Sequence, residues 1–313
     1  MMMFVQDEFM EYKHLPIMAR EILEELALHP GDMVVDATVG LGGHTKLLWE
    51  AVQPVGELYG FERDARNLVL AKEQLFGDQI GGQIGDQIGD QIGDQNLRLI
   101  NASYSAMGET VKAESVDGVL FDLGVASPQL DDPERGFSFR HDGPLDMRFD
   151  ATQGITAAEV VNQWKEEDLA EVFRKYGEEL RARVAMQAIV RRRREKLFTS
   201  TLDLAEVIAL VIPRRGRIHP ATKIFQALRI VVNDELNELS KGLEAAKLVL
   251  KPGGKLAVLT FHSLEDRIVK QFMNSQTVAG GVDSKKGYYL KPTPAEIAAN
   301  PRSRSAKLRI MVK

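Results

Sequence analysis

The segment DMVVDATVGLGGH, residues 32–44, joins an apolar run to a cluster of glycines. Residues 32–38 have the length and apolar character of a short buried strand. The glycines that follow let the backbone approach a ligand closely, and a helix that starts at His44 offers free amides at its N-terminus. The segment therefore predicts a strand, a ligand-binding loop and a helix in succession.

The same alternation continues along the chain. Helices are expected over residues 15–29, 44–52, 64–76 and 233–250, and strands over 57–62, 97–101, 116–123 and 255–261. Strands separated by helices of about ten to fifteen residues form βαβ units and a parallel sheet. Residues 288–290 and 307–312 could add a closing antiparallel pair. The pattern predicts an α/β protein.

The pattern changes after the fourth strand, where a loop-rich stretch leads into residues that are helical in pattern. We expect a helical domain over 133–217, inserted between strands four and five of an α/β domain formed by 1–132 and 218–313. Such an insertion needs a packed core of its own. The apolar residues that can supply it are Trp164, Phe173, Tyr176 and Leu197.

Residues 77–95 repeat GDQI with a period of four. Each glycine costs a helix about 1 kcal/mol relative to alanine, so a helix is not expected there. Loop-closure entropy rises slowly with length, which makes a long loop tolerable. We interpret the repeat as an expanded loop between a helix and the third strand.

The composition excludes several classes of protein. The chain has no cysteine, which rules out disulfides, thiolate metal sites and iron–sulfur clusters. No histidines are paired at i, i+4, so no tight metal site is expected. No apolar run approaches the roughly twenty residues that span a bilayer, and the N-terminus lacks a signal-type apolar core. We therefore expect a cytoplasmic protein with no membrane association.

Two segments are strongly basic although the net charge is −5. Between Arg174 and Lys223 there are 13 basic and 5 acidic residues, and between Ser284 and Lys313 there are 8 basic and 1 acidic. Basic patches on an acidic body are typical of proteins that bind an anionic polymer such as RNA. Solvated helix faces are the alternative interpretation.

Acids end three of the expected strands, at Asp36, Glu62 and Asp122. Ligands of doubly wound sheets bind at this carboxyl edge, where an acid can accept the hydroxyls of an adenosine ribose. The dinucleotide fingerprint needs a third glycine where this chain has Thr45. S-adenosylmethionine has no pyrophosphate and carries cationic groups, so the acids favour this methyl donor over a nicotinamide dinucleotide.

Four longer segments carry a resemblance to a known family: DATVGLGGHT from Asp36, DGVLFDLGVASPQLDDPERGFSFRHDGPLDMRFD from Asp117, HPATKIFQALRIVVNDEL from His219 and FHSLEDRIVKQF from Phe261. They resemble, in order, the bacterial 16S ribosomal RNA cytosine-N4 methyltransferase family. The resemblance covers nearly the whole chain, including NPRSRSAKLRI from Asn300. It implies a class I, Rossmann-like methyltransferase fold with an inserted all-helical domain for substrate recognition. It also implies N4-methylation of cytosine 1402 in the small-subunit decoding centre, with S-adenosylmethionine as donor.

The resemblance also implies which residues bind the donor. Matched by motif, they are Gly42, Gly43, His44, Glu62, Tyr104, Asp122 and Gln129. Glu62 stands where the family usually has aspartate and keeps the carboxylate on a longer side chain. Tyr104 stands where the family often has phenylalanine, against the adenine. The repeat at 77–95 departs from the family and should bulge away from the donor.

The chemistry of the target predicts a second group of residues. The lone pair of the cytosine amine is delocalised into the ring, so an acceptor for N4–H must turn it toward the methyl group. The loop Ser127-Pro128-Gln129 looks like a variant of the S-P-P-Y type loop of amino-group methyltransferases. We expect the Ser127–Pro128 backbone to hold the amine, with Asp146 and His141 as weaker candidates. The target base is expected to be flipped out or unpaired.

Other residues have competing interpretations. His219 is expected to be structural, and His262 could face the pocket or cap the next helix, where Ser263 and Asp266 suggest a capping box. Consecutive cations at 191–194 would spread around a helix, so we assign them, with Arg214, Arg215, Arg217, Arg302 and Arg304, to rRNA phosphates.

Two other functions stay open. A dehydrogenase would bind a nicotinamide cofactor, and a ribosome-assembly factor that kept the fold would bind RNA without transferring methyl groups. The oligomeric state is not determined by the sequence, although a helical insertion could pair two copies as a homodimer. The large basic surface favours the assembled small subunit over naked rRNA as the substrate.

Overall fold

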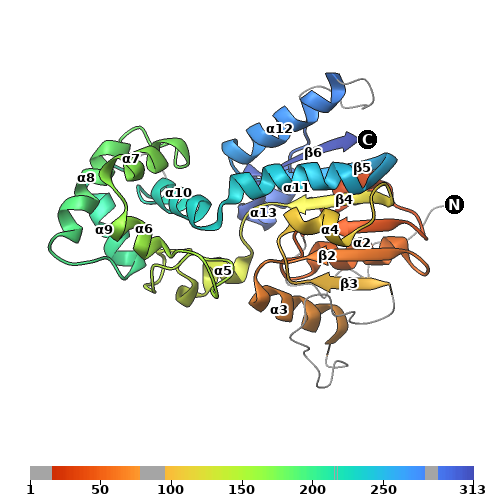
Figure 1. Cartoon of the computed structure of the whole chain (residues 1–313), viewed down its shortest axis with the longest axis horizontal. Coiled ribbons are helices and arrows are strands. Elements are labelled where there is room, and N and C mark those ends of the chain that lie inside the picture. The colour runs from red at the N-terminus through yellow and green to blue at the C-terminus, as the bar shows by residue number, and fades with distance from the viewer. Residues whose placement is uncertain (1–15, 78–95, 215, 217, 279–287) are drawn as a thin grey trace. The chain divides into compact units, whose positions relative to one another are not determined.

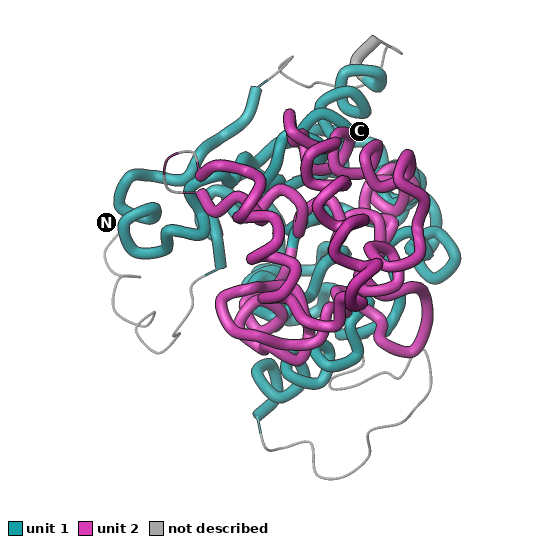
Figure 2. Tube along the Cα trace, turned by 90° about the vertical axis from the view of Figure 1, so that its left-hand side faces the viewer, with its two compact units in different colours: residues 1–124, 242–313 teal, residues 125–241 magenta. Residues whose placement is uncertain are grey.

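The computed structural model describes residues 16–77, 96–214, 216, 218–278 and 288–313. The GDQI repeat from residue 78 onward, Arg215 and Arg217 lie outside the described residues. The chain divides into two compact units, Met1–Gly124 with Gly242–Lys313 and Val125–Lys241 (Figure 2). Each unit is described by itself below.

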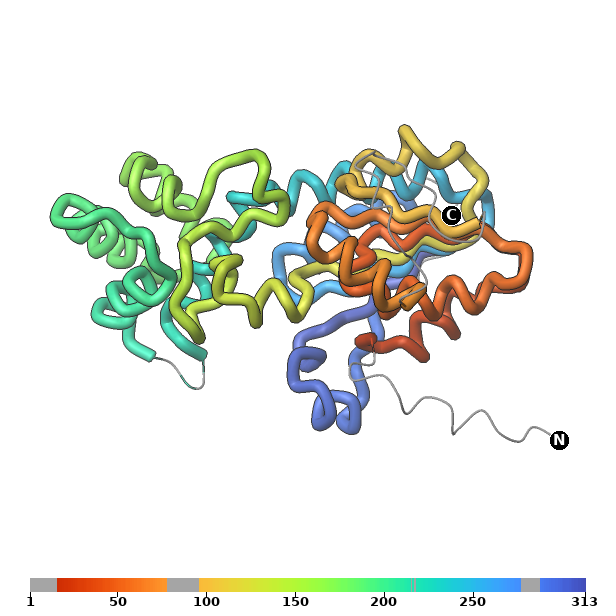
Figure 3. Tube along the Cα trace, turned by 90° about the horizontal axis from the view of Figure 1, so that it is seen from below, coloured from red at the N-terminus to blue at the C-terminus, as the bar shows by residue number. Residues whose placement is uncertain are grey.

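The first unit is built on one sheet of six strands, which lie side by side (Figure 1 and Figure 3). The strands are β1 (Met33–Asp36), β2 (Glu57–Phe61), β3 (Leu97–Ile100), β4 (Val116–Asp122), β5 (Leu250–Thr260) and β6 (Lys307–Val312). Their order is β3-β2-β1-β4-β5-β6, and only β6 is antiparallel to its neighbour. The predicted α/β sheet is confirmed. The strand order reverses between β1 and β4, which is where doubly wound sheets bind their ligands.

The closing antiparallel pair is also present. β6 pairs with β5, and an isolated bridge joins Leu290 to Leu308. The segment Lys251-Pro252-Gly253-Gly254, expected to separate a helix from a strand, instead belongs to β5. The register with β4 shifts there, since Val116 faces Leu250 and Gly118 faces Lys255. These residues form a bulge, and Gly253 has a φ of +83°, a conformation that glycine adopts without steric cost.

Helices cover both faces of this sheet. The helices of the unit are α1 (Ala19–Leu26), α2 (Gly43–Val52), α3 (Ala65–Phe76), α4 (Met107–Thr110), α12 (Ser263–Val278) and α13 (Pro294–Ala299). Ile22 of α1, Leu48 of α2 and Leu68 of α3 pack in one apolar cluster with Leu120 of β4. Phe121 faces the other side of the sheet, because side chains alternate along a strand.

The helix α11 (Glu235–Val249) starts in the second unit and ends in the first. A Cβ atom on its Gly242 would lie 2.4 Å from the ring of Tyr104 and 3.2 Å from that of Phe121. The glycine therefore lets α11 lie directly on the face of the sheet opposite α1, α2 and α3. Among the described residues, no helix is long and apolar enough to span a bilayer.

The second unit is helical. It contains α5 (Ser127–Asp131), α6 (Ala157–Gln163), α7 (Glu166–Lys175), α8 (Ala182–Arg193), α9 (Thr201–Val211) and α10 (Thr222–Asn233). Phe173 is fully buried in its core, and Trp164 and Tyr176 pack against that core. Leu197, expected in the core, is 58% exposed, and Phe198 is buried instead. Asn162 fixes this choice, because its side chain exchanges hydrogen bonds with the backbone of Phe198.

The second unit is longer at both ends than the helical domain expected over 133–217. It begins at Val125 and ends at Lys241. The reason is packing: α10 buries Ile224, Phe225 and Leu228 in the same core as α7 and α8.

Candidate functional site

Asp36, at the end of β1, fixes the glycine loop that follows it. Its side chain is fully buried and accepts hydrogen bonds from the Thr45 hydroxyl at 2.7 Å and the Thr38 amide at 3.0 Å. Burial raises the pKa of Asp36, and the hydrogen bond from Thr45 opposes that rise. Thr45, which breaks the dinucleotide fingerprint, therefore satisfies a buried acid at the base of the loop.

Glu62, just after β2, binds the same loop from the other side. One carboxylate oxygen accepts from the backbone amide of Gly40 at 2.8 Å, and the other accepts from the amide of Asp64 at 2.8 Å. Burial raises the pKa of Glu62 to about 7, although both amide hydrogen bonds oppose the rise. Each carboxylate oxygen can accept a second hydrogen bond, so Glu62 can still receive hydroxyl donors.

His44, which is buried, pairs with the partly buried Asp122 beside the loop. His44 Nδ1 lies 3.3 Å from Oδ2 of Asp122, and His44 Nε2 lies 3.0 Å from the carbonyl oxygen of Ile17. The Thr38 hydroxyl accepts from the backbone amide of Asp122 at 2.6 Å, which ties the end of β4 to the loop after β1. The second oxygen of Asp122, Oδ1, is buried and has no hydrogen-bond partner among the described residues.

Local backbone geometry and packing explain why two positions of the loop require glycine. Gly42 has a φ of +86° at the start of α2. A Cβ on Gly43 would lie 2.9 Å from the ring of Pro16. Larger residues at either place would displace the backbone of the loop and of the start of α2.

Tyr104 lies in the first unit beyond β3. Its ring meets the ring of Phe121 edge to face, with centroids 5.1 Å apart. It is half-buried and packs against Gly242. The first unit thus brings together six of the seven predicted donor-binding residues on the loop after β1 and on segments that follow β2, β3 and β4. They are Gly42, Gly43, His44, Glu62, Tyr104 and Asp122.

Gln129, Ser127 and Pro128 belong to the second unit. Ser127 and Pro128 begin α5, directly along the chain from Asp122. Gln129 is buried, and its side-chain oxygen accepts from the Ala126 amide at 2.9 Å. This local hydrogen bond fixes the start of α5 and therefore the backbone of the loop.

Asp146 is held in a two-point ion pair. Its oxygens accept from Arg148 Nε at 2.9 Å and Arg148 Nη2 at 2.8 Å. Burial raises the pKa of Asp146, but the hydrogen bonds and charge of Arg148 outweigh it, so the pKa is lower than usual. A carboxylate in this state is a weak base. His141 is exposed, and its carbonyl accepts from the Thr201 hydroxyl.

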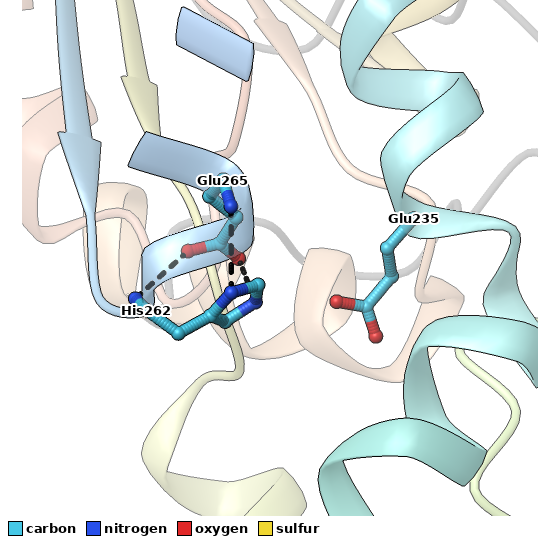
Figure 4. Close-up of side chains that lie close together, drawn as sticks. All are labelled: Glu235, His262 and Glu265. Carbon is cyan, nitrogen blue, oxygen red and sulfur yellow. Dashed lines mark hydrogen bonds and ion pairs between the residues drawn. The ribbon is translucent and has the colours of Figure 1, made fainter. Parts of the chain in front are cut away.

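The histidines of the later segments have structural contacts. The His219 ring lies 4.7 Å from that of Phe139, and its Nδ1 accepts from the Ala221 amide. Burial and the charge of Arg214 lower the pKa of His219. His262 follows β5, and its Nε2 lies 2.9 Å from Oε1 of Glu265 (Figure 4).

The capping acid of α12 is Glu265, whereas the sequence suggested Asp266. A carboxylate oxygen of Glu265 accepts from the backbone amides of Phe261 and His262. Asp266 instead pairs with Lys307 and Arg309 of β6, at 2.8 and 2.6 Å. Glu235, also drawn in Figure 4, belongs to the second unit, where it pairs with Arg229 at 2.8 Å.

Two of the four cations at 191–194, which were assigned to phosphates, make contacts within the second unit. Arg192 makes a two-point ion pair with Asp203, at 2.9 and 3.0 Å. Arg193 donates to the carbonyl oxygens of Val161 and Trp164 at the end of α6, both at 2.9 Å. Cations stabilise helix C-termini, which explains this use. Arg191 and Arg194 remain exposed, and Arg194 lies 3.5 Å from Glu166.

Sequence reasoning missed three residues that shape the site. Thr38 and Thr45 hold the loop through Asp122 and Asp36. Gly60 of β2 makes room for the loop, since a Cβ there would lie 2.6 Å from Val39. The sequence offered one signal, a threonine in place of the third glycine of the fingerprint, but its partner is visible only in the fold.

Comparison with known proteins identifies the family of the chain. The family model described as the MraW methylase family matches residues 11–313. A protein named "Ribosomal RNA small subunit methyltransferase H" from Nostoc is 44% identical, and the alignment covers 96% of this chain and 93% of that protein. Its namesake from Symbiobacterium thermophilum is 43% identical over 97% of this chain and 98% of that protein. The chain therefore belongs to the MraW methylase family.

Proposed function

We propose that this chain is an S-adenosylmethionine-dependent methyltransferase that methylates N4 of cytosine 1402 in 16S rRNA. The observation that carries the donor assignment is the buried oxygen Oδ1 of Asp122, which lacks a hydrogen-bond partner among the described residues. A buried carboxylate oxygen without a partner is costly, and a cationic ligand group would satisfy it. Family membership and the similarity to the named rRNA methyltransferases support the RNA substrate.

The residues of the first unit fit the chemical groups of the donor. Glu62 retains lone pairs for the two ribose hydroxyls while its position is fixed by Gly40 and Asp64. The amides of the first turn of α2 suit the donor carboxylate. The half-buried ring of Tyr104 offers an aromatic surface to the adenine. When bound, the donor supplies an electrophilic methyl group on a sulfonium.

Gln129, Ser127 and Pro128 complete the proposal on the basis of the family motif. The backbone of Ser127–Pro128 would accept N4–H, which frees the amine lone pair as the new bond forms. The nitrogen must be held about 3–3.5 Å from the methyl carbon. Asp146 is bound to Arg148 and has a lowered pKa, so we assign it to holding its own loop. It is not assigned as a proton acceptor.

The second unit is proposed as the substrate-recognition part of the enzyme. Its basic residues that are exposed, such as Arg191 and Arg194, can contact rRNA phosphates. We further propose that the substrate is the assembled small subunit in the cytoplasm. A homodimer is compatible with the proposal, and sedimentation of the purified protein would decide it.

The decisive experiment uses small subunits from a strain that lacks this methylation. They are incubated with the protein and labelled S-adenosylmethionine, and the RNA is digested to nucleosides for mass spectrometry. N4-methylcytidine at the expected position would establish the donor, the substrate and the reaction together. The Asp122→Asn variant serves as the matched control, because it keeps the shape of the side chain and removes its charge.

Other outcomes would redirect the proposal. A different methylated nucleoside would support the assignment of the donor and contradict the target that was inferred from the family. Binding to RNA without any methyl transfer would favour the alternative, a small-subunit assembly factor that keeps the fold. Binding of NADH in place of S-adenosylmethionine would favour a dehydrogenase, which Thr45 argues against.

A further inference from the structure

His44 lies between two groups that can only accept hydrogen bonds. Its Nε2 lies 3.0 Å from the carbonyl oxygen of Ile17, and its Nδ1 lies 3.3 Å from Oδ2 of Asp122. A neutral imidazole carries one proton, so one of its nitrogens would face an acceptor with a lone pair. Both contacts are favourable only when both nitrogens are protonated. The geometry alone therefore selects the imidazolium form.

The charges around His44 favour the same form. Asp122 at the end of β4 and Asp36 at the end of β1 are the carboxylates that face it, and the Ile17 carbonyl faces it from the segment before α1. Burial lowers the pKa of His44, but the hydrogen bond and charge of Asp122 and the charge of Asp36 outweigh it. The pKa of His44 is raised above its ordinary value.

Asp122 is held at two points. Its backbone amide is bound by the Thr38 hydroxyl, and its Oδ2 is bound by His44. Its Oδ1 is buried and is the oxygen without a hydrogen-bond partner among the described residues. The direction in which Oδ1 points therefore depends on His44, because rotation of the carboxylate would break the contact to the imidazolium.

We propose that His44 is a positioning residue. The Ile17 carbonyl holds the His44 ring, and the ring holds the Asp122 carboxylate so that Oδ1 accepts a hydrogen bond from the α-ammonium group of the methyl donor. The inference rests on the proposed function. Three parts of the donor can donate hydrogen bonds: the adenine amine, the ribose hydroxyls and the ammonium. Glu62 is assigned to the ribose hydroxyls, and Asp122 lies beside His44 at the start of α2, where the donor carboxylate is assigned. The ammonium is bonded to the same carbon atom as that carboxylate, so it is the donor group assigned to Asp122.

The test measures binding and does not depend on methyl transfer. His44→Asn, Asp122→Asn and the double variant are titrated by calorimetry with S-adenosylhomocysteine, which keeps the ammonium, and with 5′-methylthioadenosine, which lacks it. Each single variant is expected to bind S-adenosylhomocysteine about tenfold or more weakly. The double variant should bind no worse than Asp122→Asn alone, because His44 acts through Asp122. Binding of 5′-methylthioadenosine should change little.

A pH profile and a direct readout of the proton keep the inference testable if a variant folds poorly. In the wild-type protein, both ring nitrogens of His44 should carry protons at pH 7 in nitrogen-15 spectra. Affinity for S-adenosylhomocysteine should fall as pH rises through the pKa of His44, and this fall should be absent in His44→Asn. His29→Asn is the control, since His29 is an exposed histidine in the same unit.

Three results would overturn the role of His44. They are a neutral imidazole at pH 7, additive losses in the double variant, or an equal loss of 5′-methylthioadenosine binding in His44→Asn. Failure of the wild-type protein to bind S-adenosylhomocysteine at all would instead contradict the proposed function. The two failures are therefore distinguishable.

Discussion

The carboxylate of Glu62 accepts a hydrogen bond from the backbone amide of Gly40 at 2.8 Å, across 22 positions of sequence. This contact joins the end of β2 to the glycine loop that follows β1. It makes an acid assigned to the ribose also part of the structure that shapes the loop. Its protonation state should therefore affect ligand binding.

Donor binding is expected to weaken in acid because of Glu62. Its folded-state pKa is raised to about 7 by burial, so the acid becomes half protonated near neutral pH. Ribose hydroxyls donate to the carboxylate and therefore favour the ionised form. In the His44→Asn variant, which lacks the opposing titration of His44, affinity for S-adenosylhomocysteine should be roughly eightfold lower at pH 6 than at pH 7.5, from proton linkage at one site. Calorimetry at several pH values checks this.

The control for that prediction is Glu62→Gln, which cannot titrate. It should bind S-adenosylhomocysteine weakly at every pH, because one of the two backbone amides would face an amide nitrogen. Its affinity should lack the acidic fall. An affinity of His44→Asn that stays constant between pH 6 and pH 7.5 would show that Glu62 does not contact the ribose.

Gly60→Ala should disturb the donor site without touching the donor. The added Cβ would lie 2.6 Å from Val39 and 2.7 Å from Leu99, too close for either side chain to stay in place. Overpacking of this kind costs about 1–3 kcal/mol. Val39 belongs to the glycine loop, so we expect a lower melting temperature together with weaker binding of S-adenosylhomocysteine.

The matched control is Gly108→Ala. That Cβ would lie 3.2 Å from the end of the Leu248 side chain, which is 53% exposed and free to move. Gly108 lies in α4, where alanine is favoured by about 1 kcal/mol. Gly108→Ala should keep or raise the melting temperature and leave binding unchanged. If both variants behaved alike, Gly60 would have no specific role beneath the loop.

The sequence predicted the sheet well because each strand is a short apolar run between helices. β1, β2, β3 and β4 each end within two residues of the expected positions. It also predicted acids at the carboxyl edge, since parallel strands bring their ends together. Both features depend on local sequence patterns and on the alternation of strands and helices, and both can be read from the order of the residues.

What the sequence did not predict depends on partners far along the chain. Glu265 and Asp266 are adjacent acids, and only the position of β6 makes Asp266 the partner of Lys307 and Arg309. Phe198 is buried in preference to Leu197 because Asn162 fixes its backbone. Thr45 stands where the dinucleotide motif has its third glycine, and in the fold its hydroxyl donates a hydrogen bond to Asp36.

The arginines at 191–194 should separate into two classes. Arg193→Gln should lower the melting temperature, because it removes charged hydrogen bonds to the carbonyls of Val161 and Trp164, worth about 1–3 kcal/mol. Arg191, on the same helix, is exposed, so Arg191→Gln should leave the melting temperature unchanged. RNA affinity should show the reverse: Arg191→Gln should weaken it and reduce its salt dependence by about 0.7 in the logarithmic slope.

Thermal melts and RNA titrations over a range of salt concentrations measure both effects. Arg194→Gln should resemble Arg191→Gln, since its exposed pair with Glu166 contributes little to stability. If Arg191→Gln left both RNA affinity and its salt dependence unchanged, the exposed cations of α8 would serve solubility only.

Pro128→Gly tests whether the start of α5 holds the target amine. Pro128 restricts the backbone of the first turn of α5, and the carbonyls proposed to accept N4–H belong to that backbone. The variant should lower the turnover of methyl transfer strongly while affinity for S-adenosylhomocysteine stays near the wild-type value. Single-turnover methylation of small subunits, measured beside calorimetry, separates the two quantities.

Pro294→Gly, in the first turn of α13, is the control for the entropy that any such substitution adds to the unfolded chain, about 1 kcal/mol. A parallel loss of donor affinity in Pro128→Gly would assign this loop to the donor and leave the amine to another acceptor.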